Sequence, residues 1–167
     1  MLEIKIFIMF FIIVISSYIG FIKANGYVDR EKEIRNMLSA LKYMRNKIEF
    51  TNLHLKNIFE EISENIYIKD SSNIFKDVLD SKLSIKNSFI ESVKSSKKFD
   101  IEDKNILNNF AISLGKVERK VQISEIDIAY NFLIERLKDA EEKKFKNVKL
   151  YKTLGITCGL VICIIFV

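Results

Sequence analysis

Residues 143–167 read KKFKNVKLYKTLGITCGLVICIIFV, and this stretch decides how the rest of the chain is interpreted. The run from Thr153 to Val167 carries no charge. Five lysines without an acidic residue among them precede it: Lys143, Lys144, Lys146, Lys149 and Lys152. A basic collar beside a terminal apolar run is typical of a membrane anchor entered from the cytoplasmic side. The sequence therefore predicts a C-terminal transmembrane anchor over residues 150–167, with these lysines at the membrane interface.

A second apolar run lies near the start of the chain. Residues 6–22 form 17 consecutive uncharged positions, which is at the lower limit for crossing a hydrocarbon core of about 30 Å. A cleaved signal peptide is the alternative, but the run is long for a signal core, and the positions after it lack the small residues of a cleavage site. We therefore favour an uncleaved N-terminal transmembrane anchor over residues 1–25; whether it is ever cleaved stays open.

Basic residues flank both apolar runs on the side that faces the middle of the chain. Only Lys5 precedes the first run, whereas four basic residues follow it: Lys23, Arg30, Lys32 and Arg35. Such flanks stay in the cytoplasm, so residues 26–149 are predicted to form a cytoplasmic domain of an integral membrane protein. From Tyr27 to Glu142 there are 20 Lys+Arg and 21 Asp+Glu residues, a net charge of −1. The basic excess belongs to the membrane flanks, where lipids are the expected partner, and no nucleic-acid partner is expected.

The middle of the chain is predicted to be helical. It contains no proline and little glycine, and its apolar residues recur with helical spacing. Six segments are expected: a helix capped by Asp29, after a break at Asn25-Gly26, and reaching about Phe50; one from Thr51 or Asn52 to about Tyr67; a short helix after Asp70-Ser71-Ser72; one opened by Ser84; one from Asp100 to a stop at Gly115; and one from Val117 to Lys149 that continues into the anchor. The predicted fold is all-α, a six-helix cytoplasmic bundle between an N-terminal and a C-terminal transmembrane helix.

The residues that carry catalysis or bind metal are sparse. The only histidine, His54, lies at a predicted helix start. Cys158 and Cys163 are five residues apart inside the terminal apolar run, which fits neither a disulfide nor a zinc site. No glycine lies in a phosphate-binding pattern. Adjacent acidic residues flanked by lysines are interpreted as solvated helix faces: Glu60-Glu61, Glu102-Asp103 and Glu141-Glu142. We therefore expect no enzyme activity, catalytic residue, metal, cofactor or small-molecule substrate.

Both apolar runs contain two small residues four positions apart. These pairs are Ser16 with Gly20, and Gly155 with Gly159. Such spacing places small residues on one helix face and allows two membrane helices to approach closely. Chance is the alternative, because small residues are common in membrane helices. The hypothesis is that the two anchors pack against each other through these faces.

The segment Lys149-Leu150-Tyr151-Lys152-Thr153-Leu154-Gly155, followed by Gly159-Leu160, is similar to the Lys-Met-Tyr-Lys-Ser-Leu-Gly junction of the stage III sporulation protein AB family of endospore-forming bacteria. Leu114-Gly115 with Glu118, Arg119 and Gln122 resembles that family's Leu-Gly-x-Ser-Asp-Arg-Glu-x-Gln segment. Among the departures, Leu53 and His54 replace a Thr-Pro step, and Val117 replaces the serine. The resemblance spans essentially the whole chain and includes its topology.

This resemblance implies a non-enzymatic platform component of the secretion-like complex that connects the mother cell and the forespore. The family's helical domain is similar to the cytoplasmic domain of type II secretion inner-membrane platform proteins. The implied partners are other stage III sporulation A-complex proteins, including the AA ATPase, and the implied location is the mother-cell membrane. Glu118, Arg119 and Gln122 become candidates for a partner-binding surface, with a merely structural role at a helix start as the alternative.

The competing function is a membrane-tethered helical interaction protein that is not tied to sporulation. The sequence leaves open the oligomeric state, the face that binds the ATPase, and whether any substrate is transported.

Overall fold

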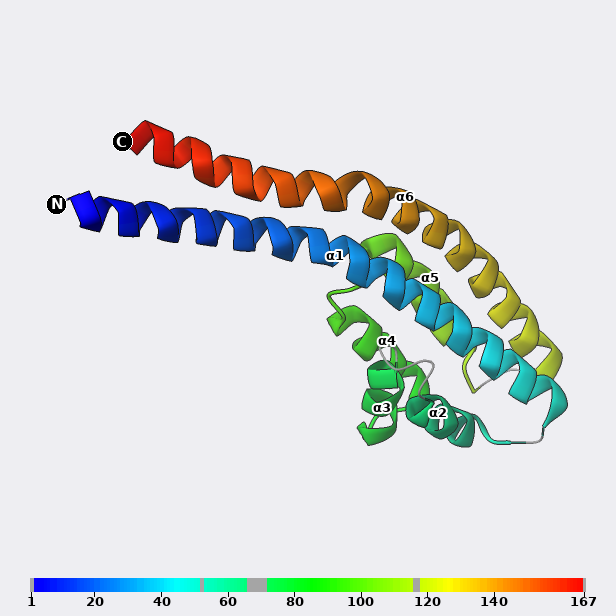
Figure 1. Cartoon of the computed structure of the whole chain (residues 1–167). Helices are drawn as coiled ribbons and strands as arrows, with labels where there is room; N and C mark the ends of the chain where they lie inside the picture. Colours follow the sequence, from blue (N-terminus) through cyan, green and yellow to red (C-terminus); the bar gives the residue numbers. More distant parts are fainter. Residues whose placement is uncertain (1, 52, 66–71, 116–117, 167) are drawn as a thin grey trace. The chain divides into compact units, whose positions relative to one another are not determined.

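The computed structural model describes residues 2–51, 53–65, 72–115 and 118–166. These residues contain six α-helices and no strand (Figure 1): α1 (Leu2–Phe50), α2 (Leu55–Glu64), α3 (Ser72–Asp80), α4 (Ile85–Ser95), α5 (Ile101–Ser113) and α6 (Arg119–Phe166). The predicted all-α class is therefore confirmed for this part of the chain. The chain divides into two compact units: a terminal unit of Met1–Asp29 with Ala140–Val167, and a central unit of Arg30–Asp139.

The terminal unit is a pair of antiparallel helical segments, one from α1 and one from α6. Both α1 and α6 contain a window that is long and apolar enough to cross a membrane. Only 11% of the α1 window and 17% of the α6 window are buried inside the protein. The large apolar side chains of these windows therefore lie mostly on the outside of the pair.

Four phenylalanine rings lie in the core of the central unit. In this unit α2 packs on α3, α3 on α4, and α4 on α5. Each of these four helices contributes one buried ring: Phe59, Phe75, Phe89 and Phe110. The ring centroids of Phe59 and Phe75 are 5.0 Å apart in an edge-to-face arrangement, and those of Phe89 and Phe110 are 5.9 Å apart. Such aromatic pairs add about 0.5–1.5 kcal/mol each to the free energy gained from burial.

The predicted break at Asn25-Gly26 is wrong, and so is the helix start at Asp29. Helix α1 runs through these residues without interruption. A glycine inside a helix costs only about 1 kcal/mol relative to alanine, and no proline stands nearby to remove a backbone hydrogen bond. The helix-forming residues on both sides of Gly26 outweigh this cost, and the helix continues. Residues of α1 therefore belong to both units.

The other helix boundaries follow their predicted caps in part. The Ser84 hydroxyl accepts a hydrogen bond from the backbone N–H of Asn87 at the start of α4. Asp100 opens α5 with a reciprocal capping box to Asp103, and Gly115 has a φ of 76° after its end, which favours glycine. These three predictions are confirmed.

The predicted start of the second helix at Thr51 is wrong. The N-cap of α2 is His54, whose side chain makes no capping hydrogen bond. The Thr51 hydroxyl instead donates to the Lys47 carbonyl oxygen at 2.6 Å, so it completes the last turn of α1. The predicted boundary residues Asn52, Tyr67, Asp70, Ser71 and Val117 lie outside the described residues.

Candidate functional site

The small residues predicted to pack between the apolar helices lie together in the terminal unit. A Cβ built on Gly20 would lie 2.9 Å from the Cα of Gly155, and one built on Gly159 would lie 3.3 Å from the Ser16 Cβ. The Ser16 hydroxyl donates a 2.6 Å hydrogen bond to the Gly155 carbonyl oxygen. Small side chains permit this close approach of the two backbones. The arrangement can hold the α1 and α6 segments of the terminal unit together.

Contacts along this pair keep one antiparallel register. The Cys163 thiol donates to the Met9 carbonyl oxygen at 3.4 Å, and Gly159 packs against Ile13. The rings of Tyr27 and Tyr151 stack with centroids 5.7 Å apart. The polar aromatic rings therefore lie at the same end of the pair as the lysine collar, Lys143–Lys152.

The lysines of the collar have two different environments. Lys144 and Lys152 are half-buried, and the Lys152 ammonium group lies 5.2 Å from the centre of the Phe21 ring. Lys143, Lys146 and Lys149 are exposed. Lys144 and Lys152 therefore lie partly against the helix pair, whereas Lys143, Lys146 and Lys149 project from it.

The three candidate partner-binding residues lie at the start of α6 in the central unit. The Glu118 carbonyl oxygen accepts the backbone N–H of Gln122 at 3.0 Å, as in the first turn of a helix. The Arg119 guanidinium donates to the Thr51 carbonyl oxygen at 2.8 Å. Arg119 and Gln122 also line a cavity of about 230 Å³ together with Ile48, Thr51, Leu53, Leu55 and Ile58. Glu118 and Arg119 are exposed and Gln122 is half-buried, so the cluster presents one charge of each sign beside a partly apolar hollow.

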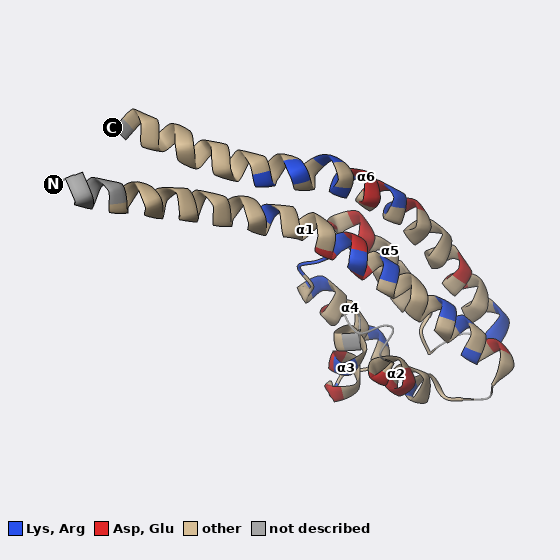
Figure 2. Cartoon of the chain, viewed as in Figure 1, with Lys and Arg blue, Asp and Glu red and all other residues tan. Residues whose placement is uncertain are grey.

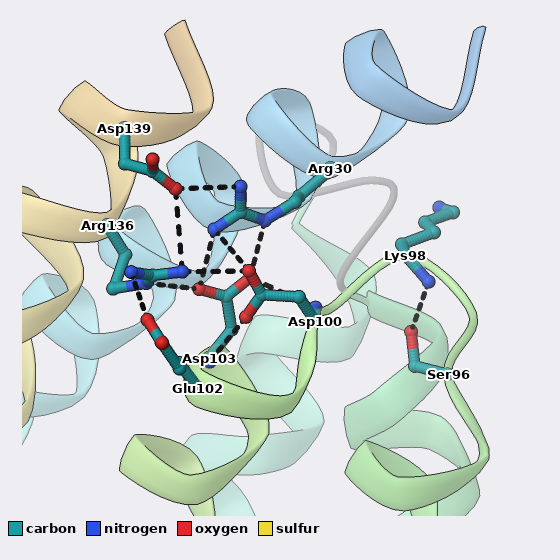
Figure 3. Close-up of polar contacts among 8 residues, drawn as sticks. All are labelled: Arg30, Ser96, Lys98, Asp100, Glu102, Asp103, Arg136 and Asp139. Atoms are coloured by element: carbon teal, nitrogen blue, oxygen red, sulfur yellow. Dashed lines mark hydrogen bonds and ion pairs between the residues drawn. The ribbon is translucent and has the colours of Figure 1, made fainter. Parts of the chain in front are cut away.

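A buried ionic network in the central unit was missed by sequence reasoning (Figure 3). At its centre is Asp103 of α5, whose side chain is 0% exposed. Its carboxylate accepts from Arg30 Nε of α1 at 2.8 Å and from Arg136 Nε of α6 at 3.0 Å. Asp100 and Asp139 neutralise the same guanidinium groups, with the nearest atoms of the Arg30 pairs 2.8 Å and 3.1 Å apart. The network thus joins three helices.

The network holds its groups in their charged forms. Burial opposes ionisation of Asp103, but the hydrogen bonds from Arg30 and Arg136 outweigh it and lower the pKa of this carboxyl. Burial likewise opposes the charge of Arg30, yet the hydrogen bond to Asp103 and the neighbouring carboxylates raise its pKa above the ordinary value. A buried network of this kind is satisfied only when all its members are present, so it fixes the positions of the helices it joins.

The prediction that Glu102-Asp103 is a solvated face is therefore wrong for Asp103. Glu102 is exposed and forms an outer ion pair with Arg136, whereas Asp103 turns inward. A signal was present in the sequence: Arg30 lies one helical turn before the buried Ile34, and Arg136 lies three residues after the buried Leu133. Two arginines that continue apolar stripes need buried acidic partners.

Little in the described parts of the chain is arranged for catalysis. His54 is exposed. No group of three His, Cys, Asp or Glu residues among the described positions could hold a metal ion. The acidic group buried most deeply, Asp103, belongs to the ionic network, where Arg30 and Arg136 neutralise it.

Comparison with known proteins identifies the family. The family model described as "Stage III sporulation protein AB" matches residues 5–167. The chain belongs to the stage III sporulation protein AB family. It is 29% identical over 164 residues to the stage III sporulation protein AB of Bacillus subtilis (strain 168), covering 93% of this chain and 94% of the relative. No solved structure matches it.

As a member of the stage III sporulation protein AB family, the chain is a sporulation protein, and the match indicates no enzyme activity. The segments that carry the family resemblance fall in both units. The junction Lys149–Gly155 lies in the terminal unit and ends at the glycine that meets Gly20. The segment from Gly115 to Gln122 lies in the central unit, and Leu53, a departure from the family pattern, lines the same cavity as Arg119.

Proposed function

We propose that this protein is a non-enzymatic platform component of the secretion-like complex that connects the mother cell and the forespore. In this proposal both ends are anchored in the mother-cell membrane, and residues 26–149 form a cytoplasmic domain that couples to the AA ATPase. The observation that carries the proposal is the family match, which extends over residues 5–167 and so includes both apolar ends. A sporulation protein with an apolar helix at each end of a charged helical domain is suited to an assembly role at a membrane.

Membrane insertion is supported by the exposure of the apolar windows. Side chains such as Phe10, Ile19 and Ile164 are 64%, 57% and 75% exposed. A soluble protein would bury most of this surface, because each apolar Å² left in water costs about 25 cal/mol. Lipid removes that cost without further protein contacts, and the Ser16–Gly155 hydrogen bond and close glycine approach suit helices packed in lipid.

The partner-binding role is proposed for Glu118, Arg119 and Gln122. Glu118 and Arg119 are exposed, and the adjoining cavity of about 230 Å³ has a mostly polar surface, to which Thr51, Arg119 and Gln122 contribute. Exposed charges of both signs beside a small polar hollow suit protein recognition, where charges and hydrogen bonds select the partner.

Affinity purification during engulfment tests this proposal. The double charge reversal E118K/R119E should lower recovery of the AA ATPase with the tagged protein at least about tenfold, because like charges then face each other at the contact. The matched control is E91K/K94E, a reversal of one exposed acid and one exposed lysine on α4, which should leave recovery unchanged. Far-ultraviolet circular dichroism should show the same helix content in all three proteins.

Two results would contradict parts of the proposal. Loss of helix content in E118K/R119E would give Arg119 a structural role through its bond to Thr51. In that case E118K alone, which leaves that bond in place, decides whether the cluster binds the ATPase. Failure of the wild-type protein to recover the ATPase at all would refute the coupling itself.

A further inference from the structure

Lys23 of α1 and the lysine collar of α6 lie toward the same end of the helix pair. Met9 lies level with Cys163, and Ile13 with Gly159. Continuing this antiparallel register toward the charged end places Lys23 of α1 level with Lys149 of α6. Figure 2 shows the result as basic residues on both segments, followed by long stretches of helix without Lys, Arg, Asp or Glu. Both helices therefore change from charged to apolar at the same height.

Three of these lysines form a stripe on the outside of α6. Lys143, Lys146 and Lys149 are three residues apart and all exposed. At 1.5 Å rise per residue this lysine stripe is roughly 9 Å long. Gly155 and Gly159, by contrast, face α1. The stripe therefore points away from the helix partner and toward whatever surrounds the pair.

Apolar side chains lie among these lysines. Phe145 is 88% exposed and Leu150 is 51% exposed. A large aromatic ring left this open is costly in water, but aromatic residues are favoured at the boundary between lipid headgroups and acyl chains. Lysines beside an aromatic ring match that boundary, with phosphate on one side and hydrocarbon on the other.

Lys146 shares its charge with one exposed acidic residue. The Lys146 ammonium lies 3.5 Å from the Glu142 carboxylate, and both side chains are 72% exposed. Exposed pairs of this kind contribute little. No acidic residue follows Glu142 in the chain, so the field around Lys149 is positive.

We infer that the lysine stripe is a binding site for the phosphate groups of anionic phospholipids, with Phe145 and Leu150 inserted beside the headgroups. This inference rests on the membrane insertion proposed above and adds lipid selectivity to it. Each lysine held near an anionic membrane surface favours that surface over an uncharged one roughly fivefold. The protein should therefore enrich anionic lipid around α6 instead of accepting any bilayer equally.

A single tryptophan can report which lipid touches the stripe, because the chain contains none. The full chain carrying F145W is reconstituted in vesicles of phosphatidylcholine and phosphatidylglycerol, with one or the other lipid brominated. Bromine quenches tryptophan fluorescence only on contact. We expect brominated phosphatidylglycerol to quench Trp fluorescence at a several-fold lower mole fraction than brominated phosphatidylcholine.

Removing the lysine charges should remove the selectivity. In F145W/K143Q/K146Q/K149Q the two brominated lipids should quench equally, whereas F145W/K76Q/K82Q/K97Q, which loses three exposed lysines of the central unit, should behave as F145W does. Retained selectivity in the first variant, or equal quenching in F145W itself, would overturn the inference.

A second reporter separates this failure from failure of membrane insertion. Leu160 lies in the uncharged part of α6 and is 47% exposed. In L160W both brominated lipids should quench strongly and to the same extent if the helix lies in the bilayer. Quenching in L160W without selectivity in F145W refutes only the lipid site; no quenching in either refutes membrane insertion as well.

Discussion

Replacing one carboxylate in the ionic network should destabilise the central unit far more than replacing its neighbour. The substitution is D103N, and the matched control is E102Q on the same helix. Both changes turn a carboxylate into an amide of similar size. Asp103 is 0% exposed, whereas the Glu102 side chain is 69% exposed. The comparison therefore isolates burial of the carboxylate from the mere loss of a negative charge.

The expected magnitude follows from the contacts of Asp103. Its carboxylate accepts from Arg30 at 2.8 Å and 3.1 Å, from Arg136 at 3.0 Å, and from the backbone N–H of Asp100 at 3.1 Å. Breaking a buried ion pair by removing one partner costs about 3–5 kcal/mol. Asp100 and Asp139 still neutralise Arg30, so we take the lower end, about 3 kcal/mol. E102Q should cost no more than about 1 kcal/mol, as for other exposed pairs.

Urea unfolding of the full chain in detergent micelles measures this difference. Helix content followed by circular dichroism should give a lower midpoint for D103N. With a slope of about 1–3 kcal/mol/M, a loss of about 3 kcal/mol lowers the midpoint by roughly 1–3 M. Urea is preferred to guanidinium chloride because a salt would screen the ion pairs under test.

The same proteins have a distinctive pH dependence. The pKa of Asp103 is lowered in the folded protein, so ionisation of this group favours folding. Its contribution is complete above its ordinary pKa of about 3.9 and is lost as the pH falls through the lowered folded value. The difference in unfolding free energy between wild type and D103N should be constant from neutral pH to about pH 5 and should shrink below about pH 4.

Equal midpoints for D103N and E102Q would refute this reasoning. They would mean that water reaches Asp103, or that the arginines find other partners without cost. A D103N protein that is destabilised equally at pH 7 and at pH 3 would show that the loss arises from packing instead of charge.

Three further predictions concern the helix pair and the aromatic core. M9C should form a disulfide with the native Cys163, because the Cys163 sulfur lies 3.4 Å from the Met9 carbonyl oxygen; C163S is the control, and no cross-link would contradict the observed register. In the M9C background, G20A should lower the cross-linking yield several-fold, because its Cβ would lie 2.6 Å from a backbone oxygen of α6. The control is G26A, which should leave the yield unchanged because a Cβ at this position meets nothing within 4 Å. F89A removes a ring that contacts three other phenylalanines and should cost about 3–5 kcal/mol in the same urea assay.

Sequence patterns were sufficient for the helical class and for several helix boundaries, because local rules determine them. Ser84, Asp100 and Gly115 are each recognisable from one residue type at one boundary, and the structure uses all three as predicted. The small residues of the apolar helices were also visible, because Ser16, Gly20, Gly155 and Gly159 repeat at one helical spacing.

The ionic network and the continuity of α1 depend on relations that a local pattern does not contain. Arg30 and Asp103 are 73 residues apart in the chain, and nothing beside Asp103 distinguishes it from the exposed Glu102. Only the packing of three helices decides which of the two acids turns inward. Gly26 is the complementary case: its local signal for a break was real, but it is worth only about 1 kcal/mol. Residues on both sides favour the helix, and their combined preference outweighs one glycine. The glycine signal therefore failed because its energy was small, and the inward turn of Asp103 was missed because the residues that determine it lie far away in the chain.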